Sequence, residues 1–202
     1  MASASAPFDA ADPVDRASDD DRGQARAFDV IYERYAPFVW RSVCRLGVPE
    51  HAADDVLQEI FLVVHRRLAD FVDREETVPW LYAIVIRVVR QYRRTTRRKS
   101  PTEAPGVGIV DPDSLVDGRR PSPPKMAERE QAIRTLYAVL DEMNDERREV
   151  FVLSELEQFS APEIAGATST NVNTVYWRLK TARQEFEKIL LRHTKAPPRS
   201  HR

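Results

Sequence analysis

A proline-rich segment divides this chain into two parts and constrains its fold more than any other feature of the sequence. Residues 100–125 hold six of the fourteen prolines and three of the six glycines, and no helical period continues through them. Proline lacks the backbone N–H and breaks helices, so we expect a flexible linker here. The length of 202 residues is enough for one ordinary domain or two small ones, and the linker favours two.

The first part, residues 25–99, has the apolar spacing of three amphipathic helices. Apolar residues recur at steps of three and four over residues 25–46, 50–71 and 79–99. Gly47-Val48-Pro49 ends the first helix, and the polar segment Asp70–Thr77 predicts a loop in which Thr77 caps the third helix. Residues 1–24 are rich in Asp, Ala and Ser without a period, so we expect a disordered acidic leader.

The second part, residues 126–192, has the pattern of four further helices over residues 126–143, 146–157, 162–167 and 172–191. Asn144 or Asp145 is placed to cap the second of these, and Asn171 to cap the last. The segment Ser160-Ala-Pro-Glu163 is a capping box that opens the short helix. Residues 193–202 form a basic tail. The expected fold is all-α, with two small helical domains joined by the linker.

A basic face follows the third helix. Seven basic residues and no acidic residue lie between Arg87 and Lys99, opposite an apolar side that includes Leu81 and Val85. Neutralising several phosphates contributes strongly to nucleic-acid affinity, so this face predicts contact with nucleic acid. The alternative is a solvated helix end, where cations also suit the macrodipole.

The segment from Ser160 to Arg183 has the spacing of a helix-turn-helix, in which a tight turn joins a short helix to a longer one. The outer face of the longer helix places Trp177 among amides, hydroxyls and cations, and an exposed tryptophan indicates a partner surface. Amides and cations pair with base edges and phosphates. An ordinary helical hairpin with a solvated polar face is the alternative.

An acidic patch lies beside the apolar stripe of the second helix. It consists of Asp54, Asp55, Gln58 and Glu59. Such a patch repels DNA and suits a basic protein partner, although a solvated helix face fits the composition equally well.

Several classes of function are excluded by what the sequence lacks. Its four histidines have no Cys or carboxylate partners at metal-ligand spacing, and it has no glycine-rich phosphate loop and no Gly-x-Ser-x-Gly motif. We therefore expect no catalytic residue, metal or cofactor. The lone Cys44 cannot form an intramolecular disulfide. We expect it to be a small apolar residue in or near the core of a helix.

The sequence also predicts a cytoplasmic protein. The start of the chain is small and acidic, without the basic and apolar regions of a signal peptide. The longest apolar stretch, Val78 to Val89, is too short to span a bilayer, so membrane insertion is not expected.

Two pairs of motifs resemble the extracytoplasmic-function (ECF) sigma factors of the sigma-70 family. Asp55-x-x-Gln58-Glu59-x-Phe61 and Trp80-Leu-Tyr-x-Ile84 resemble region 2 of that family. Glu163-Ile-Ala165 and Thr174-Val-x-x-Arg-Leu179 resemble its region 4. Their order, with a proline-rich linker between them, makes the resemblance specific.

The resemblance implies a promoter-recognition subunit of RNA polymerase that is not itself an enzyme. Region 2, residues 25–99, would bind the β′ clamp helices of core polymerase through the acidic patch. Region 4, residues 126–192, would contact the β flap and promoter DNA. An anti-sigma factor is a further expected partner. The rival interpretations are a stand-alone helix-turn-helix regulator and an adaptor that binds only protein.

The resemblance also assigns two sets of DNA-contacting residues. The minus-ten element, with the loop Asp70–Thr77, would be bound by Arg87, Arg90, Gln91, Arg94, Arg97 and Arg98. The minus-thirty-five element would be bound in the major groove by Asn173, Thr174, Tyr176, Trp177, Arg178, Lys180, Thr181 and Arg183.

Three positions depart from the family pattern. Arg87 stands where the family usually has Asn, which affects contacts at the start of the promoter-facing helix. Thr168-Ser-Thr170 replaces the usual Leu-Gly-Ile of the turn, so two apolar anchors and the turn glycine are lost. Trp177 stands where a small or polar residue is common, which predicts a distinctive promoter sequence.

Overall fold

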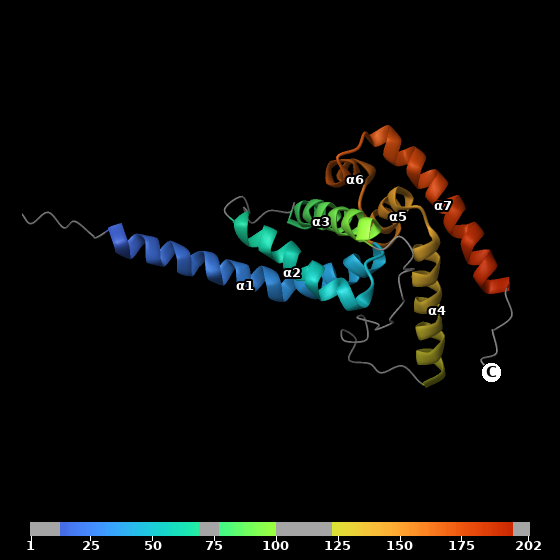
Figure 1. Ribbon diagram of the computed structural model, residues 1–202, viewed down its shortest axis with the longest axis horizontal. Helices are drawn as coiled ribbons and strands as arrows, with labels where there is room; N and C mark the ends of the chain where they lie inside the picture. Colours follow the sequence, from blue (N-terminus) through green and yellow to red (C-terminus); the bar gives the residue numbers. More distant parts are fainter. Residues whose placement is uncertain (1–12, 69–76, 100–122, 196–202) are drawn as a thin grey trace, which may run out of the picture.

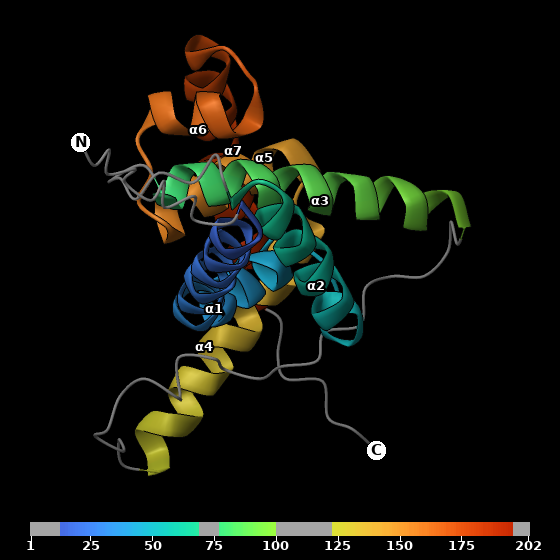
Figure 2. The same cartoon turned by 90° about the vertical axis from the view of Figure 1, so that its left-hand side faces the viewer.

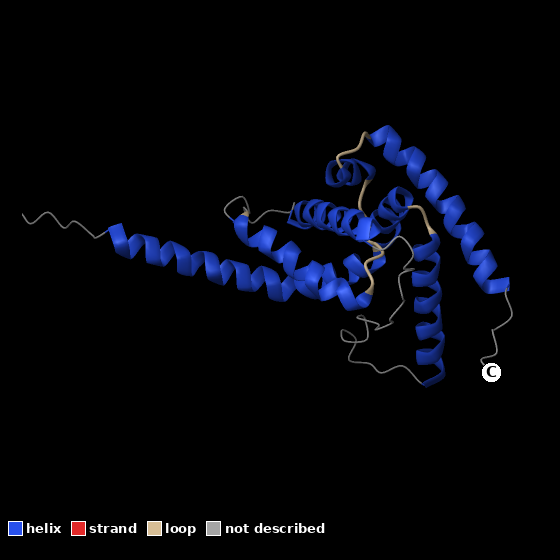
Figure 3. Ribbon diagram, viewed as in Figure 1, coloured by secondary structure: helices blue, strands red, loops and turns tan. Residues whose placement is uncertain are grey.

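The computed structural model describes residues 13–68, 77–99 and 123–195, and the regular structure of these residues is entirely helical (Figure 3). The expectation of an all-α fold is therefore confirmed. The predicted linker, apart from the residues that α4 occupies, and residues 70–76 of the predicted loop lie outside the described residues.

Three helices form the first half of the chain, and four helices with one π-helical segment form the second (Figure 1). In chain order they are α1 (Pro13–Arg45), α2 (Glu50–Arg66), α3 (Thr77–Lys99), α4 (Pro123–Glu142), α5 (Asp145–Phe151), η3 (Val152–Leu156), α6 (Ala161–Thr168) and α7 (Val172–Lys195).

The first helix starts earlier than the apolar period indicates. It begins at Pro13, so residues 13–24, which were expected to be disordered, are helical. Proline is well tolerated at the first helical position because its missing N–H has no partner there in any helix. Residues 13–24 hold one alanine and two arginines but also four aspartates and a glycine, so neither intrinsic propensity nor an apolar stripe accounts for the extension.

Other boundaries shift by a few residues. The second helix ends at Arg66 rather than at 71, and Thr77 is the first residue of α3 rather than its cap. The fourth helix begins at Pro123, inside the predicted linker, with two prolines in the first turn where they cost no hydrogen bond. The last helix continues to Lys195, past the predicted start of the basic tail at residue 193.

The predicted caps of the second half are present. The Asn144 side chain accepts a hydrogen bond from the Glu146 backbone N–H at 3.1 Å, and Asn171 Oδ1 accepts one from the Asn173 N–H at 2.9 Å. Glu163 accepts a hydrogen bond from the Ser160 backbone N–H at 2.8 Å. These bonds satisfy N–H groups that would otherwise have no partner at a helix start.

The third helix lies in the middle of the protein, with α1 and α2 against one side and α6 against the other (Figure 2). Ion pairs from Arg90 and Arg93 join it to α5. Leu81, Val85 and Val88 are buried on the side that the apolar period predicted. Tyr82 and Ile86, which lie on a different side of the helix, are buried as well. A helix that is apolar on more than one side needs a partner on each of them.

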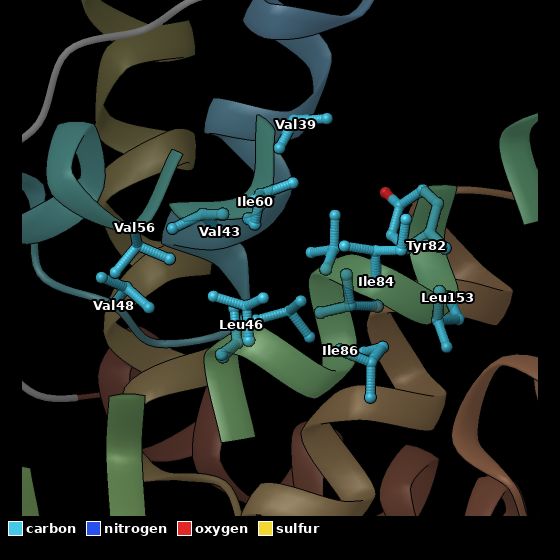
Figure 4. Close-up of a cluster of buried hydrophobic side chains, with 14 of the residues drawn as sticks. Val39, Val43, Leu46, Val48, Val56, Ile60, Tyr82, Ile84, Ile86 and Leu153 are labelled. Carbon is cyan, nitrogen blue, oxygen red and sulfur yellow. The ribbon is translucent and has the colours of Figure 1, made fainter. Parts of the chain in front are cut away.

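The two halves consequently share one hydrophobic core (Figure 4). Val43, Leu46 and Ile60 enter it from the first half, and Leu153 and Ile164 from the second. The Tyr82 ring meets the Phe159 ring edge to face, with 4.8 Å between the centroids. The linker therefore joins two helical units that pack against each other.

Candidate nucleic-acid interface

The cations of α3 divide into two sets that the sequence did not distinguish. Arg87, Arg94 and Arg98 are exposed to solvent. Arg90, Arg93 and Arg97 instead form ion pairs with carboxylates of the second half. The basic face expected from the sequence is thus only partly free to meet a ligand.

Arg90 is the most strongly held of these residues. Its Nη2 donates to Glu149 Oε2 at 2.6 Å, its Nε donates to both carboxylate oxygens, and its Nη1 donates to the Thr168 carbonyl at 3.1 Å. The Glu149 side chain is 4% exposed and that of Arg90 41%. The hydrogen bonds that Arg90 donates to Glu149 raise the pKa of Arg90. An arginine expected to contact DNA is therefore occupied by an internal carboxylate.

Arg93 and Arg97 both pair with Asp145, at the start of α5. Arg93 was not among the residues assigned to DNA, and burial lowers its pKa. Gln91, the remaining residue of the predicted set, accepts a hydrogen bond from Arg94 on the exposed side of the helix. The exposed residues of α3 therefore include Arg87, Gln91, Arg94 and Arg98, and the Arg97 side chain is also 71% exposed beside its partner Asp145.

The outer face of α7 presents the other predicted set. Trp177 is 60% exposed, and Tyr176, Asn173 and Lys180 are exposed beside it. Thr174 is half-buried. An exposed tryptophan and tyrosine on consecutive positions form an apolar patch that is unusual on a helix facing only water.

Three other predicted residues of α7 have partners within the second half. Arg178 pairs with Glu146 at 2.6 Å, and Arg183 pairs with Glu155 at 2.8 Å. The Thr181 hydroxyl donates to the Arg178 carbonyl at 2.9 Å. These side chains would have to exchange an internal partner for a phosphate in order to contact DNA.

The turn between α6 and α7 keeps a helix-turn-helix geometry without the usual glycine. Ser169 adopts a left-handed conformation with φ 53° and ψ 47°. The Thr170 N–H then donates to the Ala165 carbonyl at 2.9 Å, which closes the end of α6. A serine thus takes the conformation that glycine adopts most easily.

The acidic patch of α2 is solvent-exposed at all four positions. Asp54 Oδ1 accepts a hydrogen bond from Trp40 Nε1 at 2.9 Å, which ties the patch to α1. Leu62, one helical turn beyond Gln58, is also exposed, and we did not assign it from the sequence. The surface therefore joins carboxylates to an apolar side chain.

The acidic partners of α3 could not be predicted from the sequence. Glu149 and Asp145 belong to a short helix, Asp-Glu-Arg-Arg-Glu-Val-Phe, whose composition is that of a solvated surface. Glu149 is nevertheless buried, together with Arg148. Charged residues are seldom buried unless they are paired, and no local pattern predicts such pairing.

Neither a metal-binding cluster nor a membrane-spanning helix is found in the described ranges. No group of histidine, cysteine and carboxylate side chains there could hold a metal ion. No helix in the same ranges is long and apolar enough to cross a membrane.

Comparison with known proteins places both halves in one family. Residues 31–99 match Sigma-70 region 2, and residues 133–186 match Sigma-70, region 4. The RNA polymerase sigma-H factor of Pseudomonas aeruginosa is 26% identical over 172 residues, which cover 84% of this chain and 89% of that protein. The ECF RNA polymerase sigma-E factor of Escherichia coli is 25% identical over 170 residues, covering 82% and 87% of the two chains.

A solved structure has the same fold. The sigma factor RpoE from Bartonella quintana, crystallised with the anti-sigma factor NepR, superposes with a TM-score of 0.65. The superposition covers 81% of this chain and 96% of that one, at 15% sequence identity.

Proposed function

Since the chain belongs to the sigma-70 family of RNA polymerase sigma factors, we propose that it recruits core RNA polymerase to a defined set of promoters and helps to melt them. The observation that carries this proposal is the presence of both regions in order, each with an exposed face suited to its partner. A stand-alone helix-turn-helix regulator has no need of region 2. The protein acts by binding, without a catalytic reaction of its own, and this role is carried out in the cytoplasm.

The exposed patch of α2 is the proposed docking site for core polymerase. Asp54, Asp55, Gln58 and Glu59 would bind the β′ clamp helices, with Leu62 in the same contact. Opposite charges across an interface speed association and set its orientation, while a central apolar residue adds desolvated contact area. Region 4 would contact the β flap.

The exposed side of α3 is the proposed contact with the minus-ten element. Arg87, Gln91, Arg94 and Arg98 face solvent and can approach a DNA backbone directly. Melting requires a strand to be held with a base out of the stack, at a cost of roughly a few kcal/mol. Neutralised phosphates along this helix would help to offset that cost. Arg90 and Arg97 would join only after leaving Glu149 and Asp145.

The outer face of α7 is the proposed contact with the minus-thirty-five element. The second helix of a helix-turn-helix enters the major groove, and its first turns contact base edges. Asn173, Tyr176, Trp177, Lys180 and Thr181 lie on or beside that face, with Thr174 at its edge. Arg178 and Arg183 would hold phosphates after exchanging Glu146 and Glu155.

An anti-sigma factor is a further proposed partner. The Bartonella quintana sigma factor of similar fold was crystallised with such a protein. The exposed patch of α2 would be one surface that an inhibitor could cover to block polymerase. A pull-down that recovers polymerase but no inhibitor under any growth condition would contradict this part of the proposal.

Run-off transcription tests the main proposal. Core polymerase is mixed with the protein and a pool of genomic promoter fragments, and new transcripts with defined start sites are the expected result. The variant Asp55→Lys/Glu59→Lys should abolish both the transcripts and the association with core polymerase. Glu187→Lys/Glu128→Lys is the matched control, because these exposed carboxylates lie outside the patch. No transcripts from the wild type, together with no binding to core polymerase, would overturn the proposal.

A further inference from the structure

We propose that the protein binds a free nucleotide with two or more phosphates, in a cleft that α2, α3 and α6 line. The cleft has a volume of about 770 Å³. Clefts of roughly 300–1,000 Å³ are the usual size of small-molecule sites. The inference goes beyond the proposed function, because the site needs neither polymerase nor a promoter.

Arginines without an acidic partner gather at this cleft. Its lining includes four arginines and a single carboxylate. One of the four, Arg90, is already paired with Glu149. The side chains of Arg67 and Arg87 make no hydrogen bond or ion pair with any other described residue, and Arg94 hydrogen-bonds to a neutral amide. An anionic ligand would therefore meet three guanidinium groups that are able to donate to it.

The spacing of these arginines favours a ligand with more than one phosphate. Arg87 and Arg94 are seven residues apart on α3, which places them about 10 Å apart along the helix axis. Arg67 reaches the same cleft from the C-terminal end of α2. One phosphate group is too small to contact both arginines of α3, whereas phosphates joined to a sugar and a base are long enough.

The remainder of the lining suits a planar ring. Val63 of α2 and the buried Ile84 and Val88 of α3 give the cleft an apolar wall. Trp80, which is half-buried, lines the same cleft. Bases stack on aromatic side chains, and small-molecule sites typically combine an apolar wall with a few polar groups.

Two further side chains supply polar contacts for a nucleoside. The carboxylate of Glu59 can accept hydrogen bonds from ribose hydroxyls, and the amide of Gln91 can both donate to and accept from a base edge. Inorganic phosphate would leave both groups and the apolar wall without a contact. The lining as a whole therefore favours a nucleotide over a simple anion.

Small residues of α6 leave space on the remaining side of the cleft. Gly166 and Ala167 line it there. A Cβ added to Gly166 would meet nothing within 4 Å. A large side chain at this position can therefore occupy the cleft without a clash at its own Cβ.

Titration calorimetry of the full chain at physiological salt tests the site, with adenosine 5′-diphosphate as the probe. We expect saturable binding of one molecule per chain. Adenosine lacks the phosphates and pyrophosphate lacks the ring, so each should bind at least about tenfold more weakly. No saturable binding of the diphosphate, or equally tight binding of pyrophosphate, would overturn the inference.

Arg67→Gln should weaken binding of the diphosphate about tenfold, because it removes a charged donor from the cleft. Arg66→Gln is the matched control: Arg66 is exposed at the neighbouring position of α2 and lies outside the lining. It should change the affinity by less than about twofold, since salt screens an exposed charge. Equal losses in the two variants would show a simple charge effect and overturn the inference.

Gly166→Leu tests the cleft without changing any charge. The leucine side chain should occupy the space and abolish binding, while the thermal midpoint of unfolding is kept or raised. Gly23→Leu makes the same replacement in α1, outside the lining, and should bind as the wild type does. Wild-type affinity in a folded Gly166→Leu variant would place the ligand elsewhere and overturn the inference.

The emission of Trp80 reports directly on occupancy of the cleft. The chain has three tryptophans, so a Trp40→Phe/Trp177→Phe variant leaves Trp80 as the single emitter. The diphosphate should quench this emission over the concentration range of the calorimetric titration. Binding that leaves the emission unchanged would contradict a ring beside Trp80 and overturn the inference.

A short single-stranded oligonucleotide tests the other class of occupant. Oligonucleotide binding that Gly166→Leu abolishes, with no binding of the diphosphate, would assign the cleft to nucleic acid and overturn the inference. None of these titrations contains polymerase, so their failure leaves the proposed function in place. Absence of run-off transcription, with the diphosphate bound, would overturn the proposed function alone.

Discussion

The guanidinium of Arg148 occupies the space beside Gly47 that a side chain at position 47 would fill. A Cβ atom on Gly47 would lie 1.6 Å from Arg148 Nη1, and Gly47 has a φ of +88°. Arg148 Nη2 donates to the Asp141 carbonyl at 2.7 Å, and the side chain is 3% exposed. The turn after α1 thus receives a buried cation from the second half, and only glycine leaves room for it.

Gly47→Ala should therefore destabilise the protein by about 2–4 kcal/mol, because it adds a steric clash to an unfavourable backbone conformation. Urea unfolding followed by circular dichroism measures this change. Gly23→Ala is the matched control: Gly23 lies in α1 with nothing within 4 Å of an added Cβ. That variant should gain about 0.5–1 kcal/mol from helix propensity. A Gly47→Ala variant as stable as the wild type would show that Arg148 is not held beside the turn.

Ser169→Gly should stabilise the protein by about 1 kcal/mol, since glycine adopts the left-handed conformation without the cost that a Cβ imposes. The thermal midpoint of unfolding measures the gain. Thr170→Gly provides the comparison, because Thr170 is not among the residues with positive φ. It should lose stability through the greater freedom of its unfolded chain. If both glycine variants lose stability, the left-handed turn is not a feature of the protein in solution.

Trp177→Ala should lower run-off transcription about tenfold or more, because a base contact contributes about 1–3 kcal/mol of discrimination. The free energy of unfolding should change by less than about 0.5 kcal/mol, as expected for an exposed side chain. Leu191→Ala removes another exposed apolar side chain of α7, far from the turn, and should leave transcription unchanged. Wild-type transcription by Trp177→Ala would remove this residue from the promoter contact.

Cys44 should react slowly in the folded protein. Burial, aided by the carboxylates of Glu50 and Asp54, raises the pKa of its thiol from 9.0 to about 12. Because the thiolate is the reactive form, labelling with Ellman's reagent at mildly alkaline pH should be about 100-fold slower in the folded than in the unfolded protein. Similar rates in the two states would place Cys44 at the surface.

The same shift gives a pH dependence of stability. The folded protein holds the Cys44 proton more tightly than the unfolded protein does, so this contribution is complete below about pH 9 and is lost as the pH rises toward about 12. Cys44→Ala should therefore lose less stability than the wild type as the pH rises from about 9 toward about 12. Parallel losses in the two proteins would contradict the raised pKa.

Local patterns predicted most of the helices. The apolar periods located the seven helices, and the caps at Asn144, Ser160 and Asn171 were visible as short motifs. Helix starts and caps depend on residues within one turn of each other, so a sequence shows them directly. The predicted start of α1 was wrong because its first twelve residues lack the apolar stripe on which the prediction relied.

The exposed parts of the candidate interface were also accessible from the sequence. The patch of α2 and the aromatic face of α7 lie opposite apolar stripes, and the structure leaves both in solvent. The order of motifs identified the family, which the comparisons with known proteins support.

The partner of each cation was decided by tertiary structure alone. Arg90 and Glu149 are 59 residues apart, and nothing near either residue indicates the other. The sequence by itself determined which side chains are cationic, which helices carry them and which sides of those helices are apolar. Only the packing of α3 between the two halves determined that three of its seven cations form ion pairs with carboxylates of the second half. The pairing of a cation with a carboxylate depends on which surfaces of distant helices meet, and helical periodicity does not predict this.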